Sequence, residues 1–302
     1  MLIRFFYTCM LCMLTIFAHA QTLRIATYQY ADNNRIKNIQ PFADLLKAKH
    51  GMDTEVKSYP TIHDMIAGIQ NNEVDIAFIN TFGYFLLETS EKDYPMVPGY
   101  TLAVRNDAVD NYKTAIITTA GSALKNLEDV GKTASQSRLM LVATGSTSGN
   151  LVPRLAFSHI GLADCEKNFK SVGYAGNHTL AIQSIVNQEA EIAAMGFTEY
   201  EKIARDPAMA AKLKLIWRSP EIPLGPVLLH NGLHHSTRSE IEKALQSLHI
   251  ENKLVLESIK EGWSEAKYAS HYISINDSFY DSFRKTLGKD KDLQRILKQF
   301  AN

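Results

Sequence analysis

Three consecutive hydroxyl residues, Ser146, Thr147 and Ser148, lie between two glycines and offer the clearest chemistry in this sequence. They follow an apolar run over 139–143 and open a helical pattern over 150–160. The first backbone N–H groups of a helix have no partner within the helix, and the helix dipole places partial positive charge there. A helix entrance of this kind is suited to hold a phosphate-like anion.

Two other interpretations of the same segment stay open. An ordinary helix N-cap needs only one hydroxyl, and Pro153, in the first turn, places the helix entrance at 148–150. The segment is also similar to the G-x-S-x-G turn of serine hydrolases, although its central residue is Thr147. A triad of Ser146, His178 and an Asp would make the protein an acyl hydrolase, which turnover of an ester would reveal.

The first twenty residues have the features of an export signal. Arg4 precedes an apolar core over 5–17, and the small-x-small sequence 18–20 (AHA) predicts cleavage near Ala20. That core is too short to span a bilayer, and no later apolar run approaches the roughly 20 residues that a spanning helix needs. We therefore predict a periplasmic protein. Cys165 is the one cysteine after the signal, so no internal disulfide is expected.

Charge and motif content exclude several classes of partner. The 32 basic and 32 acidic residues are spread evenly along the chain, which argues against nucleic acid or a charged membrane surface as partner. The histidines at 230, 234 and 235 are interpreted as a solvated loop before a helix rather than a metal site. The segment 131–133 (GKT) resembles the end of a P-loop, but Asn126 replaces its first glycine. We expect no cofactor and no metal.

The order of predicted strands and helices indicates two α/β lobes. The first series alternates strand and helix as a βαβαβ unit with a mostly parallel sheet, over 23–28, 41–50, 54–59, 63–71 and 74–79. A second series follows the same pattern, over 132–144, 150–160, 168–172, 180–187 and 190–195. Lobe 1 is expected to comprise 21–101 plus 222–302, and lobe 2 to comprise 102–221.

The chain is expected to cross between the lobes near 100–105 and again near 217–229, and these crossings would be hinges. Helical patterns over 236–261, 277–287 and 291–300 are expected to pack on lobe 1. The lobes also echo each other, because a helix starting near His63 leads into 74–77 (VDIA) and one starting at His178 leads into 190–193 (AEIA). We predict that both helix N-termini face one cleft.

With these elements in order, the chain resembles the phosphonate/phosphate/phosphite-binding periplasmic proteins, which capture ligands for ABC importers. The resemblance covers nearly the whole chain after the signal and implies a type II periplasmic binding protein-like fold. Four segments carry it: 74–78 (VDIAF) with Tyr84 following, 124–129 (LKNLED) before 131–133, 146–149 (STSG) with Pro153, and 215–220 (LIWRSP) before 222–223.

The resemblance implies roles for individual residues. Ser146, Thr147 and Ser148 match the hydroxyl trio that grips the phosphorus-bound oxygens. Tyr100 matches a pocket tyrosine, and His178 matches a pocket histidine that donates to the oxyanion, more strongly if charged. Tyr84, beyond the carboxyl end of a predicted strand, is a further candidate for the cleft. The implied protein is a monomer whose partner in the inner membrane is an ABC permease or, alternatively, a sensor kinase.

The departures from the family pattern concern the ligand's substituent. Family members that bind an aminoalkyl phosphonate have carboxylates where this chain has Thr198 and Gly225. Glu199 is one position away, and on a helix one residue is a rotation of about 100 degrees, so it is expected to point elsewhere. A family tyrosine falls near Ile62, with Tyr59 or His63 as replacements. We predict a compact oxyanion such as phosphate, phosphite or a small uncharged phosphonate, with sulfur and arsenic oxyanions as alternatives.

Overall fold

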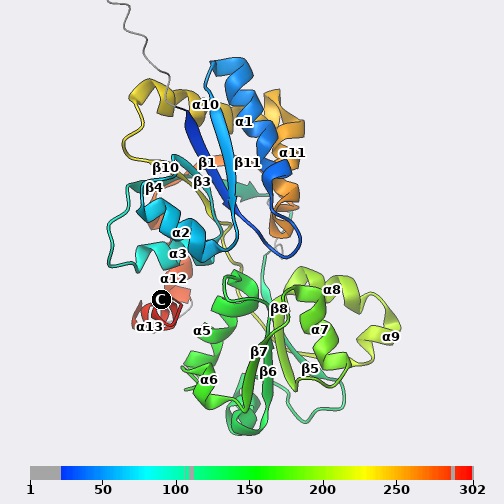
Figure 1. The fold of residues 1–302 in the computed structure, drawn as a ribbon. Coiled ribbons are helices and arrows are strands. Elements are labelled where there is room, and N and C mark those ends of the chain that lie inside the picture. Colours follow the sequence, from blue (N-terminus) through cyan, green and yellow to red (C-terminus); the bar gives the residue numbers. More distant parts are fainter. Residues whose placement is uncertain (1–21, 106, 109–111, 287–289, 301–302) are drawn as a thin grey trace, which may run out of the picture.

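The computed structural model describes residues 22–105, 107–108, 112–286 and 290–300, so the predicted export signal lies outside the described residues. Figure 1 shows two α/β lobes, each built on its own sheet. The predicted fold class is confirmed. None of the helices in the described part of the chain is both long enough and apolar enough to cross a membrane.

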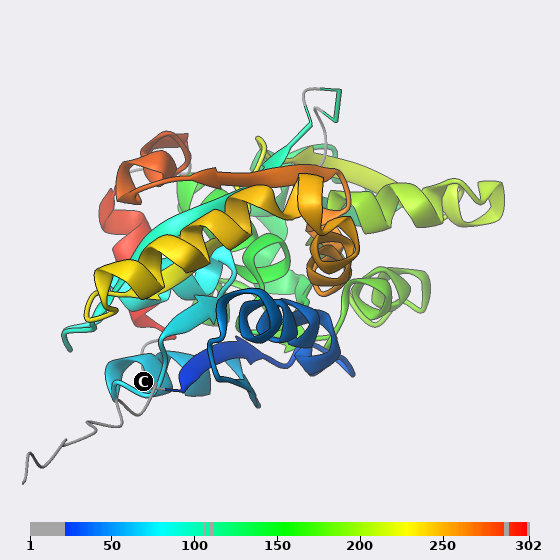
Figure 2. The ribbon, with the colours of Figure 1, turned by 90° about the horizontal axis from the view of Figure 1, so that it is seen from above.

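Lobe 1 begins with a parallel βαβαβ unit, which consists of β1 (Leu23–Tyr28), α1 (Ile36–His50), β2 (Thr54–Tyr59), α2 (Ile62–Gln70) and β3 (Ile76–Phe78). The helix α3 (Thr81–Glu88) and the strand β4 (Met96–Val104) follow it. The chain returns to this lobe later with β10 (Pro226–His230), α10 (His235–Glu251), α11 (Lys253–Glu261), β11 (Ala269–Ser274), α12 (Asp281–Thr286) and α13 (Asp290–Lys298). Seen from above, α1 and α11 lie side by side, and α10 runs alongside β11 (Figure 2).

Lobe 2 repeats the pattern around a smaller sheet. Its elements are β5 (Thr114–Thr119), α4 (Leu127–Thr133), β6 (Arg138–Leu141), α5 (Val152–His159), α6 (Cys165–Asn168), β7 (Ser171–Tyr174), α7 (His178–Val186), β8 (Ile192–Gly196), α8 (Phe197–Ala204), α9 (Pro207–Ala210) and β9 (Leu213–Arg218). The chain enters this lobe between β4 and β5 and leaves it between β9 and β10.

Both sheets are mixed, so the predicted mostly parallel sheet is wrong beyond the βαβαβ cores. The strand orders are β11-β4-β10-β3-β1-β2 in lobe 1 and β7-β6-β8-β5-β9 in lobe 2. Strand β1 pairs in parallel with β2 and β3, but β10 pairs antiparallel with both β3 and β4. The reason is the double crossing, because β4 carries the chain out of lobe 1 and β10 brings it back in the opposite direction.

The sequence echo between the lobes corresponds to one ion-pair arrangement used twice. In lobe 1, the Arg24 guanidinium donates to both carboxylate oxygens of Asp75, at 2.9 and 2.8 Å, and the Arg24 backbone N–H donates to the same carboxylate. The guanidinium also donates to the carbonyl of Asn72, whose φ of 60° is left-handed. These bonds fix the start of β1 against the turn that leads into β3.

Lobe 2 contains the same bonds at the start of β6. Arg138 donates from its guanidinium and its backbone N–H to Glu191, and from its guanidinium to the carbonyl of Gln188, which also has a φ of 60°. The two sites differ in burial: the Asp75 side chain is 3% exposed, whereas the Glu191 side chain is 43% exposed. Loss of the arginine should therefore lower the free energy of unfolding more at the Arg24–Asp75 pair than at the Arg138–Glu191 pair.

The lobes share a hydrophobic contact on one side of the molecule. Leu151, Val152 and Leu155, at the start of α5 in lobe 2, pack in the same core cluster as Phe82 of α3 and the α13 residues Ile296 and Leu297. The Arg295 guanidinium of α13 donates to Ser158 Oγ of α5 at 2.8 Å. The last helix therefore packs on both lobes, not on lobe 1 alone as the sequence predicts.

The two arginine sites provide a matched pair of stability tests. Replacing Arg24 with Met leaves the Asp75 carboxylate buried without its charged partner, which should lower the free energy of unfolding by on the order of 3 kcal/mol. Arg138→Met should lower it far less, because water can solvate Glu191. Urea denaturation of both variants measures the difference. Equal losses would contradict the burial argument.

Candidate functional site

The hydroxyl segment forms the entrance to α5, two residues earlier than predicted. Ser146 is the N-cap, and its Oγ accepts a hydrogen bond from Gly149 N at 3.0 Å. A π-helical turn over Thr147–Leu151 (η2) precedes α5. A side chain at position 149 would place Cβ 2.3 Å from Val142 Cγ2, so this close approach of the turn to the end of β6 requires glycine.

The three hydroxyl side chains are buried, and they take part in contacts beyond their own turn. Thr147 Oγ1 accepts a hydrogen bond from Phe82 N of lobe 1 at 3.0 Å. Tyr112, from the first crossing between the lobes, lies near the side chains of Thr147 and Ser148, which oppose the rise in the pKa of its hydroxyl that burial causes. Nearby, Asn80 Nδ2 donates to the carbonyl of Gly145 at 2.9 Å. The hydroxyl turn is therefore the place where lobe 2 meets α3 and the crossing.

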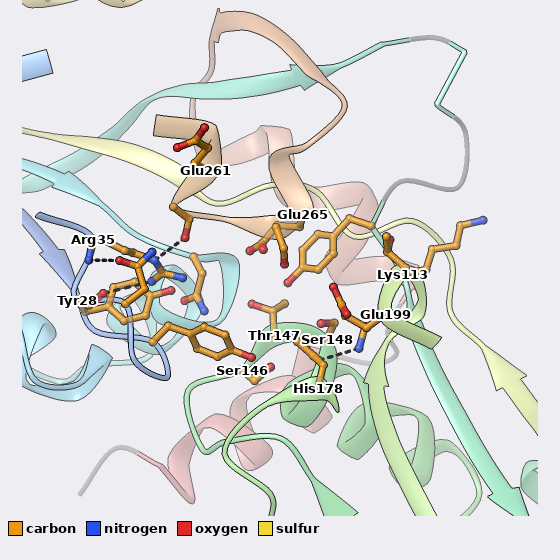
Figure 3. A pocket seen from close by; sticks show the side chains of 18 residues that line it. Tyr28, Arg35, Lys113, Ser146, Thr147, Ser148, His178, Glu199, Glu261 and Glu265 are labelled. Atoms are coloured by element: carbon orange, nitrogen blue, oxygen red, sulfur yellow. Dashed lines mark hydrogen bonds between the residues drawn. The ribbon is translucent and has the colours of Figure 1, made fainter. Parts of the chain in front are cut away.

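A cavity of about 200 Å³ lies above this turn and is lined by both lobes. Figure 3 shows Thr147, Ser148, Glu199 and Glu265 around a common space, whereas Lys113 extends away from it. Lobe 2 and the crossing contribute Tyr112, Lys113, Ser146, Thr147, Ser148, His178, Gly196, Thr198 and Glu199. Lobe 1 contributes Tyr28, Tyr30, Asn33, Arg35, Asn80, Glu261, Gly262, Ser264 and Glu265. The structure thus brings together four of the six predicted ligand-binding residues, the hydroxyl trio and His178.

His178 lines the cavity as a neutral ring. Its Nδ1 accepts a hydrogen bond from Gly196 N at 2.9 Å, so in the neutral ring the proton is assigned to Nε2. Burial lowers the pKa of His178 to about 4. The charged histidine considered from the sequence is therefore replaced by a neutral N–H donor.

Tyr84 and Tyr100 lie away from the cavity and do not line it. The Tyr84 hydroxyl donates to Asp277 Oδ1 at 2.6 Å, and its ring packs against Tyr280. The Tyr100 hydroxyl accepts from Gln246 Nε2 of α10 at 2.7 Å. Each ring faces the C-terminal elements that cover lobe 1, so the predicted contact of these tyrosines with the ligand is corrected. Tyr112 is the tyrosine that reaches the cavity from the crossing.

The loop after β1 supplies residues that the sequence analysis missed. Tyr28 and Tyr30 line the cavity, and the Tyr30 hydroxyl is buried with no hydrogen-bond partner in the described part of the chain. The Tyr30 ring lies 6.1 Å from the His178 ring of the other lobe. A signal was available, because ligands of open α/β sheets bind at the carboxyl ends of the strands and Tyr28 ends β1.

Arg35 joins the two lobe 1 loops that line the cavity. Its guanidinium lies 4.5 Å from the ring centroids of both Tyr28 and Trp263. It also donates to the carbonyls of Gly262, at 2.7 Å, and Tyr28, at 3.3 Å. Arg35 is the N-cap of α1 with a left-handed φ of 60°, a strained conformation for a residue other than glycine. This buried guanidinium therefore fixes the lobe 1 wall of the cavity.

Only one of the two echoed helix N-termini reaches the cavity. His178 at the start of α7 lines it, but His63 in α2 packs against Phe82, with ring centroids 6.1 Å apart. The Phe300 ring, in the C-terminal segment, also packs against Phe82, with ring centroids 5.8 Å apart, and its backbone lies close enough to His63 to affect the pKa of that ring. The prediction that both N-termini face the same cleft is wrong for α2, because the C-terminal segment lies on that side.

Carboxylates also line the cavity. Glu199 lies in the first turn of α8, which begins at Phe197, and it lines the cavity instead of pointing away as predicted. Glu265 comes from the short turn η3 (Ser264–Ala266) that follows α11. Burial raises the pKa of the Glu265 carboxyl, and the charge of Arg35 opposes that rise.

Comparison with known proteins places this site in context. Residues 25–272 match the family model described as ABC transporter, phosphonate, periplasmic substrate-binding protein. A curated phosphonates-binding periplasmic protein of Escherichia coli is 27% identical over 236 residues, which cover 76% of this chain and 67% of that protein.

Two solved structures have the same fold. A binding protein component of a phosphonate ABC transporter from Pseudomonas aeruginosa matches with a TM-score of 0.65 at 18% identity, covering 93% of this chain and 95% of that one. A Prochlorococcus marinus protein, solved in complex with methylphosphonate, matches with a TM-score of 0.65 at 16% identity, covering 92% and 98%. At these identities the likeness establishes the architecture.

The neutral state of His178 predicts a loss of stability on acidification. The folded-state pKa of about 4 is below the unfolded value of about 6.5, so the unfolded chain binds the extra proton and the free energy of unfolding falls as the pH drops from 6.5 toward 4. The share due to His178 is up to about 3 kcal/mol. His178→Asn, which keeps an acceptor for Gly196 N, should flatten this slope. Urea denaturation at pH 7, 5.5 and 4.5 measures it, and an unchanged slope would refute the assignment.

Proposed function

The chain belongs to the periplasmic substrate-binding proteins of phosphonate ABC transporters, and from this premise we propose that its cavity captures a phosphorus-type oxyanion for an ABC importer. The candidate head groups are those of phosphate, phosphite and a small phosphonate. The partner in this proposal is the importer's permease in the inner membrane. Members of this family bind substrates for transport and are not enzymes, so the alternative of a serine acyl hydrolase is wrong.

The observation that carries this proposal is that the buried hydroxyls of Ser146 and Thr147 accept backbone hydrogen bonds and can still donate their own. Ser146 Oγ and Thr147 Oγ1 each already accept a backbone N–H, from Gly149 and Phe82 respectively. A hydroxyl that accepts in this way still has its own O–H to donate. An oxyanion has only acceptors, so it matches side chains whose remaining capacity is to donate.

Two further donors come from opposite lobes. In lobe 2, Nδ1 of the neutral His178 ring accepts a hydrogen bond from Gly196 N, so the ring proton lies on Nε2 and can be donated. In lobe 1, the buried Tyr30 hydroxyl has no partner among the residues that the structure describes. A buried donor without an acceptor is unfavourable. An oxyanion between these rings would satisfy both donors and hold the lobes together.

Selectivity among oxyanions follows from how well the acceptor oxygens of each ligand match the hydrogen-bond donors of the cavity. An anion that enters the cavity loses its hydration, and each lost contact with water must be replaced by a protein donor. A ligand with fewer acceptor oxygens, or with oxygens in the wrong places, leaves hydroxyls unpaired. We therefore expect the site to discriminate among oxyanions by geometry and protonation.

Single donor deletions test the proposal. Ser146→Ala, Thr147→Val and Tyr30→Phe should each weaken the binding of methylphosphonate or phosphite by about one to two decades, on the order of 1.5 to 3 kcal/mol. Calorimetry with phosphate, phosphite, methylphosphonate and sulfate measures these losses and identifies the preferred head group.

Ser247→Ala is the matched control, because that serine lies on α10 and does not line the cavity. Its affinity should equal that of the unmodified protein. Unchanged affinity in the Ser146 and Thr147 variants would refute the proposed binding role of the hydroxyl turn.

A further inference from the structure

We propose that Thr114, which does not line the cavity, is a positioning residue that makes Ser146 a stronger hydrogen-bond donor toward an oxyanion. Thr114 is the first residue of β5, and its side chain is fully buried. The inference rests on the proposed function, because it concerns how the hydroxyl turn donates to its ligand.

The π-helical register of the hydroxyl turn cannot supply a backbone donor to the carbonyl of Ser148. Leu151 N donates to the carbonyl of Ser146, five residues earlier, at 3.1 Å, and the next residue repeats this bond with Thr147. The following donor in this register would be residue 153, but Pro153 has no N–H. The carbonyl of Ser148 therefore needs a donor from outside the turn.

The Thr114 hydroxyl is that donor. Its Oγ1 lies 2.7 Å from the carbonyl oxygen of Ser148, which is 34 residues away in the chain. A hydroxyl at this distance from a carbonyl donates its proton, since the carbonyl can only accept. Removal of the Thr114 hydroxyl would leave a buried carbonyl without this hydrogen bond, at the middle of the binding segment.

The same hydroxyl is linked to Ser146 through one peptide group. The carbonyl of Ser148 and the N–H of Gly149 belong to this group, and Gly149 N donates to Ser146 Oγ at 3.0 Å. The hydrogen bonds run in one direction, from Thr114 through the peptide group to Ser146, whose own O–H can then be donated to an oxyanion. Because each bond in such a chain polarises the next, donation by Thr114 makes Ser146 a stronger donor.

The backbone of Thr114 is fixed between the two crossings and the strand β8. Thr114 N donates to Ser219 Oγ at 2.8 Å, and Ser219 N donates to the carbonyl of Thr114 at 3.0 Å. Ser219 directly follows β9, where the chain leaves lobe 2. In the sheet, Thr114 pairs with Gly196, whose N–H donates to Nδ1 of His178. The frame that supports His178 therefore also holds the Thr114 hydroxyl against the hydroxyl turn.

Thr118, on the same strand, provides a matched control. Its side chain is also buried, and its Oγ1 donates to the carbonyl of Glu191 at 2.8 Å. Neither Thr118 nor Glu191 lines the cavity. Thr114→Val and Thr118→Val therefore remove the same kind of hydrogen bond from the same strand, and only the first of them interrupts the chain to Ser146.

Calorimetry with methylphosphonate, phosphite and phosphate tests the role of Thr114 in binding. Thr114→Val should weaken the binding of whichever of these ligands the unmodified protein prefers by about three- to tenfold, because one hydrogen bond of the chain is lost. Thr118→Val should leave that affinity unchanged, although both variants lose stability in urea. Thr114→Ser, which keeps the hydroxyl, should bind as the unmodified protein does.

The Gly149 amide gives a second readout that needs no ligand. Its proton resonance in a nitrogen–proton correlation spectrum should move upfield in Thr114→Val, because a less polarised N–H forms a weaker hydrogen bond with Ser146. The resonance should stay in place in Thr118→Val. Thr114→Cys is a milder second variant, since S–H is a weak donor, and it should move the affinity and the resonance in the same directions by smaller amounts.

The outcomes separate this inference from the proposed function. Unchanged affinity in Thr114→Val, or equal losses of affinity in the two valine variants, would overturn the positioning role while the proposed function stands. An unmoved Gly149 resonance in Thr114→Val would overturn the polarisation of Ser146 even if the affinity fell. If the unmodified protein bound none of the three ligands, the proposed function would be refuted, and this inference with it.

Discussion

The hydrogen bond from Phe82 N of lobe 1 to Thr147 Oγ1 of lobe 2 connects the arrangement of the lobes with the chemistry of the cavity. It leaves the O–H of Thr147 as the group that this hydroxyl can still donate. It also keeps α3 against the hydroxyl turn, and Asn80 adds a second bond beside it. Any movement that separates the lobes at this point changes the hydroxyl turn as well. The contact between the lobes and the geometry of the hydroxyl turn are therefore linked in this molecule.

Each lobe is built on the same motif, yet the lobes serve the cavity differently. Arg24 with Asp75, and Arg138 with Glu191, fix equivalent turns before β3 and β8. Of the two equivalent helices, α7 presents its N-terminus to the cavity, whereas α2 is covered near its N-terminus by Phe82 and the C-terminal segment. Lobe 1 instead contributes the loops after β1 and α11, which Arg35 holds together. The cavity is therefore asymmetric, with the three buried hydroxyls and His178 on lobe 2, the rings of Tyr28 and Tyr30 on lobe 1, and carboxylates on both lobes.

The charges in the cavity follow from this asymmetry. The hydroxyls and the neutral His178 give lobe 2 a surface that donates hydrogen bonds without carrying full charge. Glu265 brings a carboxylate to the other wall, where burial raises its pKa and the charge of Arg35 opposes that rise.

The sequence by itself determined the features that depend on neighbours along the chain. The strands Leu23–Tyr28 and Thr54–Tyr59 have the predicted bounds, because alternation and burial are encoded locally. The two-lobe α/β fold followed from the order of strands and helices, and the hydroxyl turn followed from its residue types. The tertiary structure alone decided which distant residues share the cavity. Tyr84 and Tyr100 turned to the C-terminal elements, while Tyr30, Tyr112 and Glu265 reached the cavity from three separate segments. The physical reason is that a side chain's direction depends on what packs against its element, and that packing involves residues far away in the chain.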